Sequence, residues 1–118
     1  MSSLIRFVDV LNNVNEIDFN QYLFMPKNKE WSLNSLCSLI DWDELEDDEI
    51  GDDEETPQFA IDNNLIYVAN IATVQDIVNN AKSQKLECLE SDLFEAFMYY
   101  YKNDSFMSIF NKIIDNEE

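Results

Sequence analysis

The sequence predicts an α+β domain in which a small sheet of two or three antiparallel strands is covered by about four helices. Segment 65–70, LIYVAN, is short and apolar on both alternating faces, as in a buried strand. Four longer segments place apolar residues at helical spacing. The 118 residues are 46% hydrophobic and include eight Phe, five Tyr and two Trp, which is enough for one core. We therefore expect a single domain over residues 1–118.

The N-terminal half predicts one helix and two strands. Residues 4–12 carry apolar side chains on one helical face, and one of the two serines before Leu4 can cap the first turn. Residues 22–25 form a short apolar run ended by Pro26, which favours an edge strand. Residues 35–42, SLCSLIDW, predict a second strand that leads directly into an acidic segment.

The C-terminal half predicts a helical turn, a strand and three helices. Residues 57–61 predict one turn that begins at a proline. The strand at 65–70 should be central in the sheet, because both faces are apolar, and should share that sheet with residues 36–42. A sequence similar to a capping box begins at Thr73. The predicted helices span residues 73–84, 92–102 and 105–114. The expected core residues are Phe7, Leu39, Ile40, Ile66, Val68, Ile77, Phe97 and Phe110.

Residues 41–55, DWDELEDDEIGDDEE, dominate the charge of the chain. Eleven of these fifteen residues are Asp or Glu and none is Lys or Arg, in a chain whose net charge is -18. Burying such carboxylates without partners would cost several kcal/mol per ion, so the segment must lie on the surface. This charge opposes direct binding to nucleic acid or to an anionic membrane and favours a cationic protein.

The residues needed for common enzyme and metal chemistry are absent. The chain has no His, and its single Gly excludes the Gly-rich phosphate loops. The acidic segment begins like a calcium-binding EF-hand loop at Asp41, but Leu45 and Glu46 occupy positions that need an oxygen ligand and a glycine. Chance pairs of carboxylates are unavoidable in so acidic a chain and indicate nothing. We expect no enzyme activity, no cofactor and no metal site.

The two cysteines, and the lack of a long apolar segment, favour a cytoplasmic location. Cys37 and Cys88 lie in apolar surroundings without the spacing of a metal or redox motif, and two buried free thiols fit a reducing cytoplasm. The first residues lack the apolar run of a signal peptide, and no segment approaches the roughly 18 apolar residues of a membrane span. We expect a cytoplasmic protein that is monomeric when free.

The candidate partner-binding residues are the acidic segment and two aromatic residues. Trp42 and Tyr99 are predicted as interface anchors, although each is equally compatible with packing. Neutralising Asp52–Glu55, after a flexible Gly51, should slow association modestly. Neutralising the acids nearer the strand should weaken binding more, because they extend from ordered backbone. The full predicted set is Asp41, Trp42, Asp43, Glu44, Glu46, Asp47, Asp48, Glu49, Asp52, Asp53, Glu54, Glu55 and Tyr99.

Three segments resemble a family of small, acidic, uncharacterised bacterial domains. They are WSLNSLCSLID at 31–41, VQDIVNNAKSQ at 74–84 and DLFEAFMYYYKNDSF at 92–106. The resemblance implies a strand, an acidic linker and two helices in that order, and it carries no catalytic residue. In size and charge alone the chain is also similar to bacterial immunity proteins that neutralise basic toxins.

Three functions are compatible with these features. The first is a binding protein that masks a cationic partner, such as the active site of a nuclease toxin. The second is a nucleic-acid mimic that inhibits a DNA-binding or defence complex, which needs charges spread along a length. The third is an accessory or structural module whose charge serves solubility. Clustering of the acids within 41–55 favours the first over the second.

Overall fold

A single antiparallel sheet divides the molecule into two unequal sides. The computed structural model describes residues 3–85 and 87–103. Its strands are β1 (Ile5–Arg6), β2 (Tyr22–Pro26), β3 (Leu36–Ile40) and β4 (Leu65–Asn70), arranged in the order β1-β3-β2-β4. The predicted α+β class is therefore confirmed, with four strands where two or three were expected.

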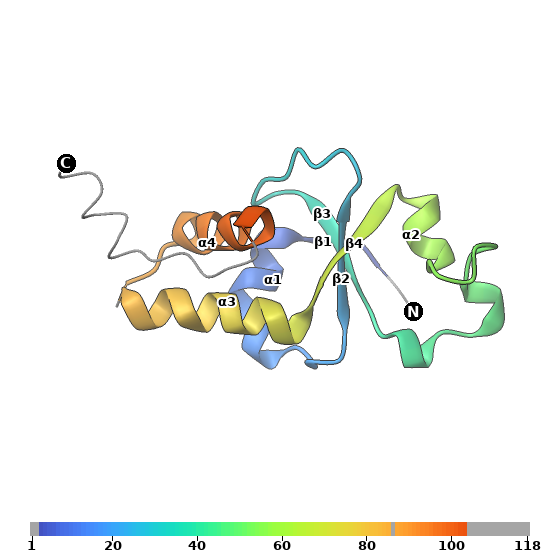
Figure 1. The fold of residues 1–118 in the computed structure, drawn as a ribbon, viewed down its shortest axis with the longest axis horizontal. Helices are drawn as coiled ribbons and strands as arrows, with labels where there is room; N and C mark the ends of the chain where they lie inside the picture. Colours follow the sequence, from blue (N-terminus) through green and yellow to red (C-terminus); the bar gives the residue numbers. More distant parts are fainter. Residues whose placement is uncertain (1–2, 86, 104–118) are drawn as a thin grey trace.

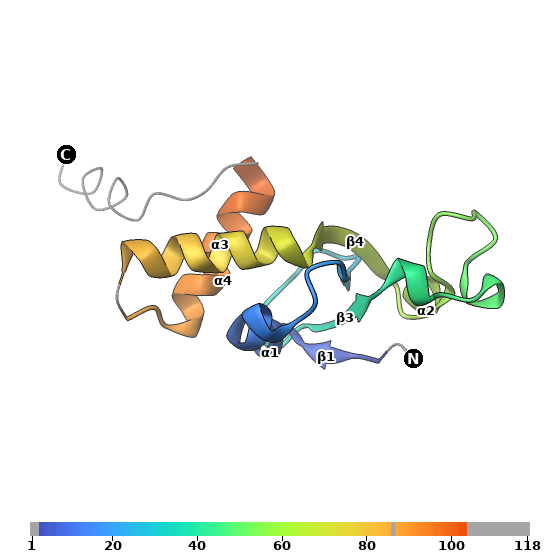
Figure 2. The ribbon, with the colours of Figure 1, turned by 90° about the horizontal axis from the view of Figure 1, so that it is seen from below.

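Helices cover the two sides of the sheet very differently. The helices are α1 (Phe7–Asn13), α2 (Gln58–Asp62), α3 (Ile71–Gln84) and α4 (Glu90–Asn103). Helices α1, α3 and α4 lie on one side of the sheet, whereas the short α2 and the acidic segment lie on the other (Figures 1 and 2). The helix predicted at 105–114 lies outside the described residues. No helix in the described ranges is long and apolar enough to cross a membrane.

The lateral positions of two strands are the reverse of those predicted. β2 lies between β3 and β4, and β4 is at the edge of the sheet. Pro26 is compatible with an inner strand because it is the last residue of β2, where the ladder ends. β4 carries apolar residues on both faces although only Leu65 is buried and Tyr67 is 53% exposed. An apolar pattern on both faces says nothing about the neighbours of a strand along the sheet. Segments 36–40 and 65–70 do share one sheet, as expected.

The N-terminal segment begins as a strand before it becomes a helix. Ile5 and Arg6 pair with β3, and α1 begins only at Phe7. No side chain caps this helix. Its first amides instead donate to backbone carbonyls, Phe7 N to Ser35 O at 2.8 Å and Val8 N to Leu33 O at 2.8 Å. These bonds satisfy donors that a serine cap was expected to satisfy.

Helix α3, in contrast, begins earlier than predicted, because its cap is an asparagine. The side chain of Asn70, the last residue of β4, accepts a hydrogen bond from Thr73 N at 2.8 Å. Thr73 is thus inside the first turn and does not cap it. Asn70 closes a direct connection from strand to helix, and this fixes where α3 leaves the sheet.

The main core lies between the sheet and helices α1, α3 and α4. Phe7 and Phe97 are nearly inaccessible, and their rings pack edge to face with centroids 4.8 Å apart. Of the predicted core residues, Phe7, Ile40, Ile77 and Phe97 are buried. Leu39, Ile66 and Val68 are partly buried against this core, and Phe110 lies outside the described residues.

Both cysteines are free, as predicted, but only one of them is buried. Cys37 lies in the main core, and its thiol donates to Ile5 O at 3.4 Å. Burial, with a smaller contribution from the charge of Asp9, raises the pKa of the Cys37 thiol to about 12. Cys88 lies in the connection between α3 and α4 and is half-buried.

Candidate functional site

The acidic loop, residues 41–55, leaves the end of β3 and is folded by its own carboxylates. It begins with two short 3₁₀ turns, Trp42–Glu44 and Asp47–Glu49. The Asp41 carboxylate accepts from Asp43 N at 3.0 Å, and the Glu49 carboxylate accepts from Glu46 N at 3.0 Å. Side chains that accept backbone amides in this way give a charged loop a defined conformation without regular structure.

The second half of the loop is closed more tightly than expected. Gly51 is buried and its amide donates to Thr56 O at 2.7 Å, next to an isolated bridge between Ile50 and Pro57. A Cβ at Gly51 would lie 2.3 Å from Ile61 Cδ1 and 2.9 Å from Thr56 O. The glycine is therefore required for a close approach of two chain segments, and the expectation of a flexible hinge at this residue is wrong.

Asp53 organises the turn that follows Gly51. Its carboxylate accepts from the Thr56 hydroxyl at 2.7 Å, from Thr56 N at 2.9 Å and from Glu55 N at 3.0 Å. The Thr56 hydroxyl, and then the two amides, hold the pKa of Asp53 below its usual value. Glu54, at the tip of this turn, has the left-handed conformation with φ 58°.

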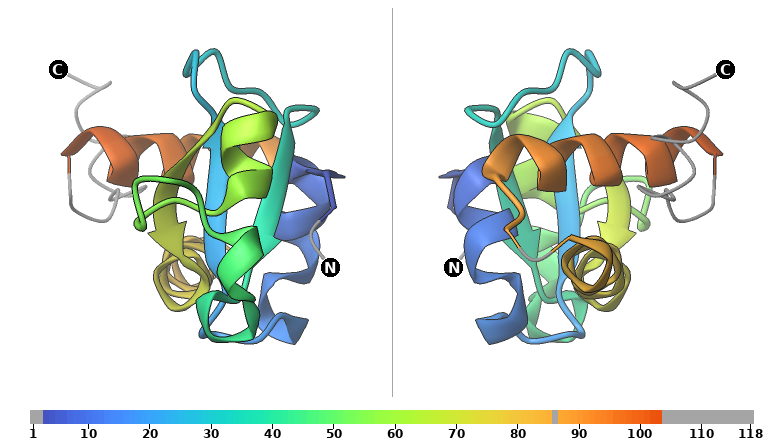
Figure 3. Two further views of the ribbon diagram at one scale, coloured as in Figure 1. Left: turned by 90° about the vertical axis from the view of Figure 1, so that its right-hand side faces the viewer. Right: turned by 90° about the vertical axis from the view of Figure 1, so that its left-hand side faces the viewer.

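A second, small apolar cluster attaches the loop to the sheet. Leu45 of the loop and Phe59 of α2 pack against it. Figure 3 shows the loop and α2 in front of the strands, on the side opposite the long helices. The buried members of this cluster are Phe24, Ile40, Ala60 and Leu65.

The charge of the loop is exposed. Nine of its eleven acidic residues are exposed, and only Asp41 and Glu49, which bind backbone amides, are half-buried. Within the described part of the chain, no ion pair involves an acidic residue of this loop; Arg6–Asp9 and Lys85–Asp92 lie elsewhere. The acidic segment therefore lies on the surface. No group of three or more described His, Cys, Asp or Glu side chains is arranged to hold a metal ion.

The structure separates the two predicted aromatic anchors. Trp42 is half-buried at the start of the acidic loop. Tyr99 is 40% exposed on α4, which lies on the opposite side of the sheet from the loop (Figure 1). One flat partner surface cannot contact both residues, so Tyr99 does not belong to the same site as the loop.

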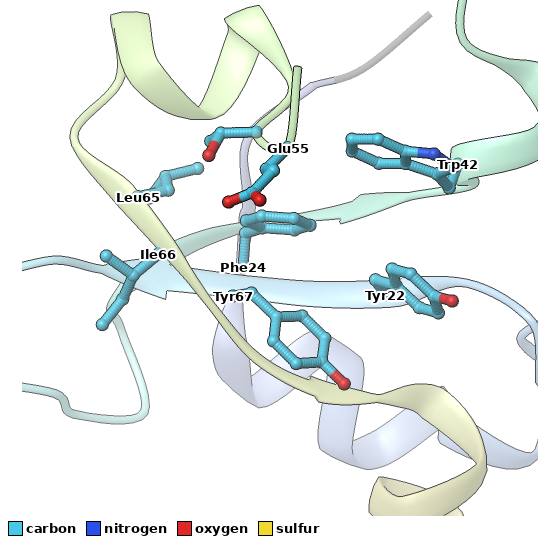
Figure 4. Close-up of a pocket in the computed structure, with 8 residues that line it drawn as sticks. Tyr22, Phe24, Trp42, Glu55, Leu65, Ile66 and Tyr67 are labelled. Carbon is cyan, nitrogen blue, oxygen red and sulfur yellow. The ribbon is translucent and has the colours of Figure 1, made fainter. Parts of the chain in front are cut away.

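An aromatic groove lies beside the acidic loop, and most of its residues were not among the site residues predicted from the sequence. It has a volume of about 430 Å³. Tyr22 and Phe24 come from β2, and both lie edge to face against Tyr67 of β4, with centroids 5.5 and 5.9 Å apart. Trp42 and Glu55 complete it from the loop, as Figure 4 shows. The lining residues are Tyr22, Phe24, Trp42, Glu55, Thr56, Leu65, Ile66 and Tyr67.

The alternation of two strands was the available signal for this groove. Tyr22 and Phe24 are two residues apart and therefore share a face of β2, as Leu65 and Tyr67 do on β4. Register brings Phe24 opposite Tyr67, and a bulge between Leu23 and Phe24 in the pairing leaves Val68 without a partner on β2. The pKa of the Tyr67 phenol is raised, first by burial and then by the nearby Tyr22 phenol.

The fold and site define an acidic α+β domain whose charged loop and aromatic groove share one side of a four-stranded sheet. The chain belongs to a family described as a domain of unknown function, DUF7716, whose model matches residues 4–109. This confirms the predicted membership of an uncharacterised family of small domains. Neither the curated proteins nor the solved structures include a significant match.

Proposed function

We propose that this chain binds a cationic protein through the acidic loop and masks its active surface, as immunity proteins do with nuclease toxins. The observation that carries the proposal is the acidic loop itself, in which eleven carboxylates stand on backbone held by its own hydrogen bonds. A nuclease cleft is positively charged because it must hold phosphates. A dense patch of opposite charge steers association with such a cleft and competes for it.

Order in the loop reduces the entropic cost of docking. Side chains and loops that become fixed on binding each cost free energy, so a preformed loop binds more tightly than a disordered one of the same charge. Asp41 and Asp53 hold the two halves of the loop. Because both halves are held, we now expect comparable contributions from them, in place of the unequal contributions predicted from a flexible Gly51.

The position of the charge favours masking over nucleic-acid mimicry. A mimic needs carboxylates spaced along a length, as phosphates are. Here the two 3₁₀ turns and the turn at Asp53 gather the charges of the loop at one end of the molecule, beyond the sheet (Figure 1). Mimicry and a role in solubility alone are the alternatives that the experiment must separate.

The experiment compares three variants that each remove three negative charges. The first-half variant is Asp43→Asn, Glu44→Gln and Asp47→Asn, and the second-half variant is Asp52→Asn, Glu54→Gln and Glu55→Gln. Neither variant removes the structural carboxylates of Asp41, Glu49 and Asp53. The matched control, Glu16→Gln, Asp76→Asn and Glu87→Gln, changes exposed acids outside the loop by the same total charge.

The partner is first captured from the source cell with the unaltered chain and identified. Its association rate with each variant is then measured at low and high salt, together with its own activity. We expect a basic partner whose activity the chain inhibits, and slower association for both loop variants than for the control, with a difference that shrinks at high salt. An equal effect of all three variants, or a partner that is not cationic, would reject the proposal. Displacement of the chain by duplex DNA together with binding insensitive to the loop would instead support mimicry.

A further inference from the structure

We infer that the aromatic groove is a receptor for a single cationic side chain, Lys or Arg, of the partner. The inference rests on the proposed function for the identity of the partner, but the preference of the groove for a cation can be tested alone. It assigns a role to the two exposed tyrosines Tyr22 and Tyr67, which do not belong to the apolar cluster that attaches the acidic loop to the sheet.

The groove has an aromatic floor and accessible aromatic walls. Phe24 is only 4% exposed and forms the floor, whereas Tyr67 is 53% exposed and Tyr22 is 36% exposed. A tyrosine as accessible as Tyr67 is expected to contribute little to the core. Its ring packs against the other two rings, so that it forms the wall of the groove.

The charge in the groove comes from the acidic loop. Glu55 extends from the loop toward Phe24, with Trp42 and Tyr22 on one side of it and Leu65 on the other (Figure 4). Its backbone is fixed because Glu55 N donates to the Asp53 carboxylate at 3.0 Å. The carboxylate is thus directed into the groove by the same turn that orders the second half of the loop.

Aromatic rings together with one carboxylate select a cation over other occupants. The faces of Trp, Tyr and Phe are negative, so an ammonium or guanidinium group near them is attracted, and the attraction grows when water is excluded. The four-carbon and three-carbon stems of Lys and Arg suit the apolar floor, while the head reaches the carboxylate. An anionic side chain would meet both Glu55 and the field of the loop, and a neutral apolar chain would gain nothing from either.

The test uses small model side chains with the intact protein. Nα-acetyl-arginine methylamide and Nα-acetyl-lysine methylamide are titrated separately, and aromatic carbon and proton shifts are followed by NMR. The neutral control is Nα-acetyl-citrulline methylamide, which has nearly the shape of arginine without its charge. We expect saturable shifts at Tyr22, Trp42 and Tyr67 with the two cations, and binding of citrulline at least 10-fold weaker than that of arginine, about 1.4 kcal/mol.

Two variants of the groove and one control complete the design. Tyr67→Leu removes one ring and should weaken arginine binding by about 2- to 5-fold, the range expected for one exposed cation–π contact. Glu55→Gln keeps the shape of the groove and should weaken arginine binding by up to about 5-fold, the range expected for one exposed ion pair. Tyr99→Leu alters an exposed tyrosine on the other side of the sheet and should leave binding unchanged. If Tyr67→Leu disturbs the fold, Glu55→Gln alone still decides.

Equal binding of citrulline would overturn the inference in favour of a groove for uncharged side chains. Shifts confined to the acidic residues of the loop, without the rings, would overturn it in favour of diffuse charge attraction. Failure of the inference is separate from failure of the proposed function. Capture of a cationic partner that is insensitive to Glu55→Gln and Tyr67→Leu would reject the groove and leave masking by the loop in place. Selective arginine binding without a cationic partner would support the groove and reject masking by the loop.

Discussion

The two sides of the sheet differ in what holds them together. Among the residues that the structure describes, sixteen form one buried cluster on the side of the long helices, whereas the buried cluster on the side of the acidic loop has four. Apolar burial is the main source of stability, so the first side should carry most of the free energy of unfolding. The second side is held by short turns and carboxylate–amide bonds, which open at lower cost. The molecule therefore separates the part that stabilises the fold from the part that carries the exposed acidic charge.

The largest expected effect comes from the core on the helix side. Phe97→Ala removes a ring packed against Phe7 at 4.8 Å and should lower the free energy of unfolding by about 3–5 kcal/mol. Leu45→Ala, on the loop side, removes a partly buried chain and should cost about 1 kcal/mol. Urea unfolding followed by circular dichroism measures both. Equal losses would mean that the two sides share stability and would contradict the comparison.

A smaller loss should follow from Gly51→Ala, within the loop side alone. The new methyl would clash with Ile61, whose side chain can move, and with the Thr56 carbonyl, which cannot move without breaking its hydrogen bond from Gly51 N. We expect a cost of about 1–3 kcal/mol. Amide exchange should become faster at residues 51–56 and stay unchanged in α3 and α4.

If amide exchange in the Gly51→Ala variant increased equally in the helices, the loop and the core would unfold as one unit. A matched control is Ala72→Gly in the first turn of α3, which perturbs the helix side by less than the roughly 1 kcal/mol that glycine costs in a helix interior. It should raise exchange in α3 and leave residues 51–56 unaffected.

The order of the described strands and α-helices after β1 could be predicted from the sequence, because hydrophobic periodicity distinguishes helices from strands. β1 lies where the start of a helix was expected. Periodicity did not distinguish a central strand from an edge strand. β4 is apolar on both faces and lies at the edge, whereas β2 ends in a proline and lies inside. Lateral position depends on which strands pair, and pairing depends on register and on contacts between distant segments. The same limit applies to α1, whose first amides are bound by residues 33–35 rather than by a neighbouring serine.

The charged part of the candidate site could be predicted, and the aromatic part could not. A run of eleven acids must be exposed whatever the fold, so the position of the loop follows from solvation. The groove needs Tyr22 and Tyr67 to be neighbours, which depends on the pairing of β2 with β4. Tyr99 was a plausible anchor because it is exposed, but the fold places α4 on the other side of the sheet.

The reactivities of the two thiols should differ, because Cys37 lies in the interior of the helix side and Cys88 lies at its margin. Burial raises the pKa of Cys37 to about 12, so almost no thiolate is present at pH 8. Burial also raises the pKa of Cys88, but this residue is only half-buried. A disulfide reagent should therefore modify one thiol slowly in the native protein and two in denaturant. Cys88→Ser should abolish the native reaction, and two native thiols of equal rate would contradict the burial of Cys37.

The smallest effect concerns Asp53 and tests whether carboxylate–amide bonds hold the loop side. The Thr56 hydroxyl, and then the amides of Glu55 and Thr56, lower the pKa of Asp53. A folded-state pKa below the unfolded value means that the turn is stabilised above pH ~4 and loses this stabilisation as pH falls through the pKa of Asp53. Thr56→Val should raise that pKa toward its usual value, as measured by NMR titration of the carboxyl carbon. Thr73→Val, on the helix side, should not move it. If Thr56→Val also leaves it unchanged, then the hydroxyl does not order the turn, and the loop side depends on Leu45 and the Gly51–Thr56 bond instead.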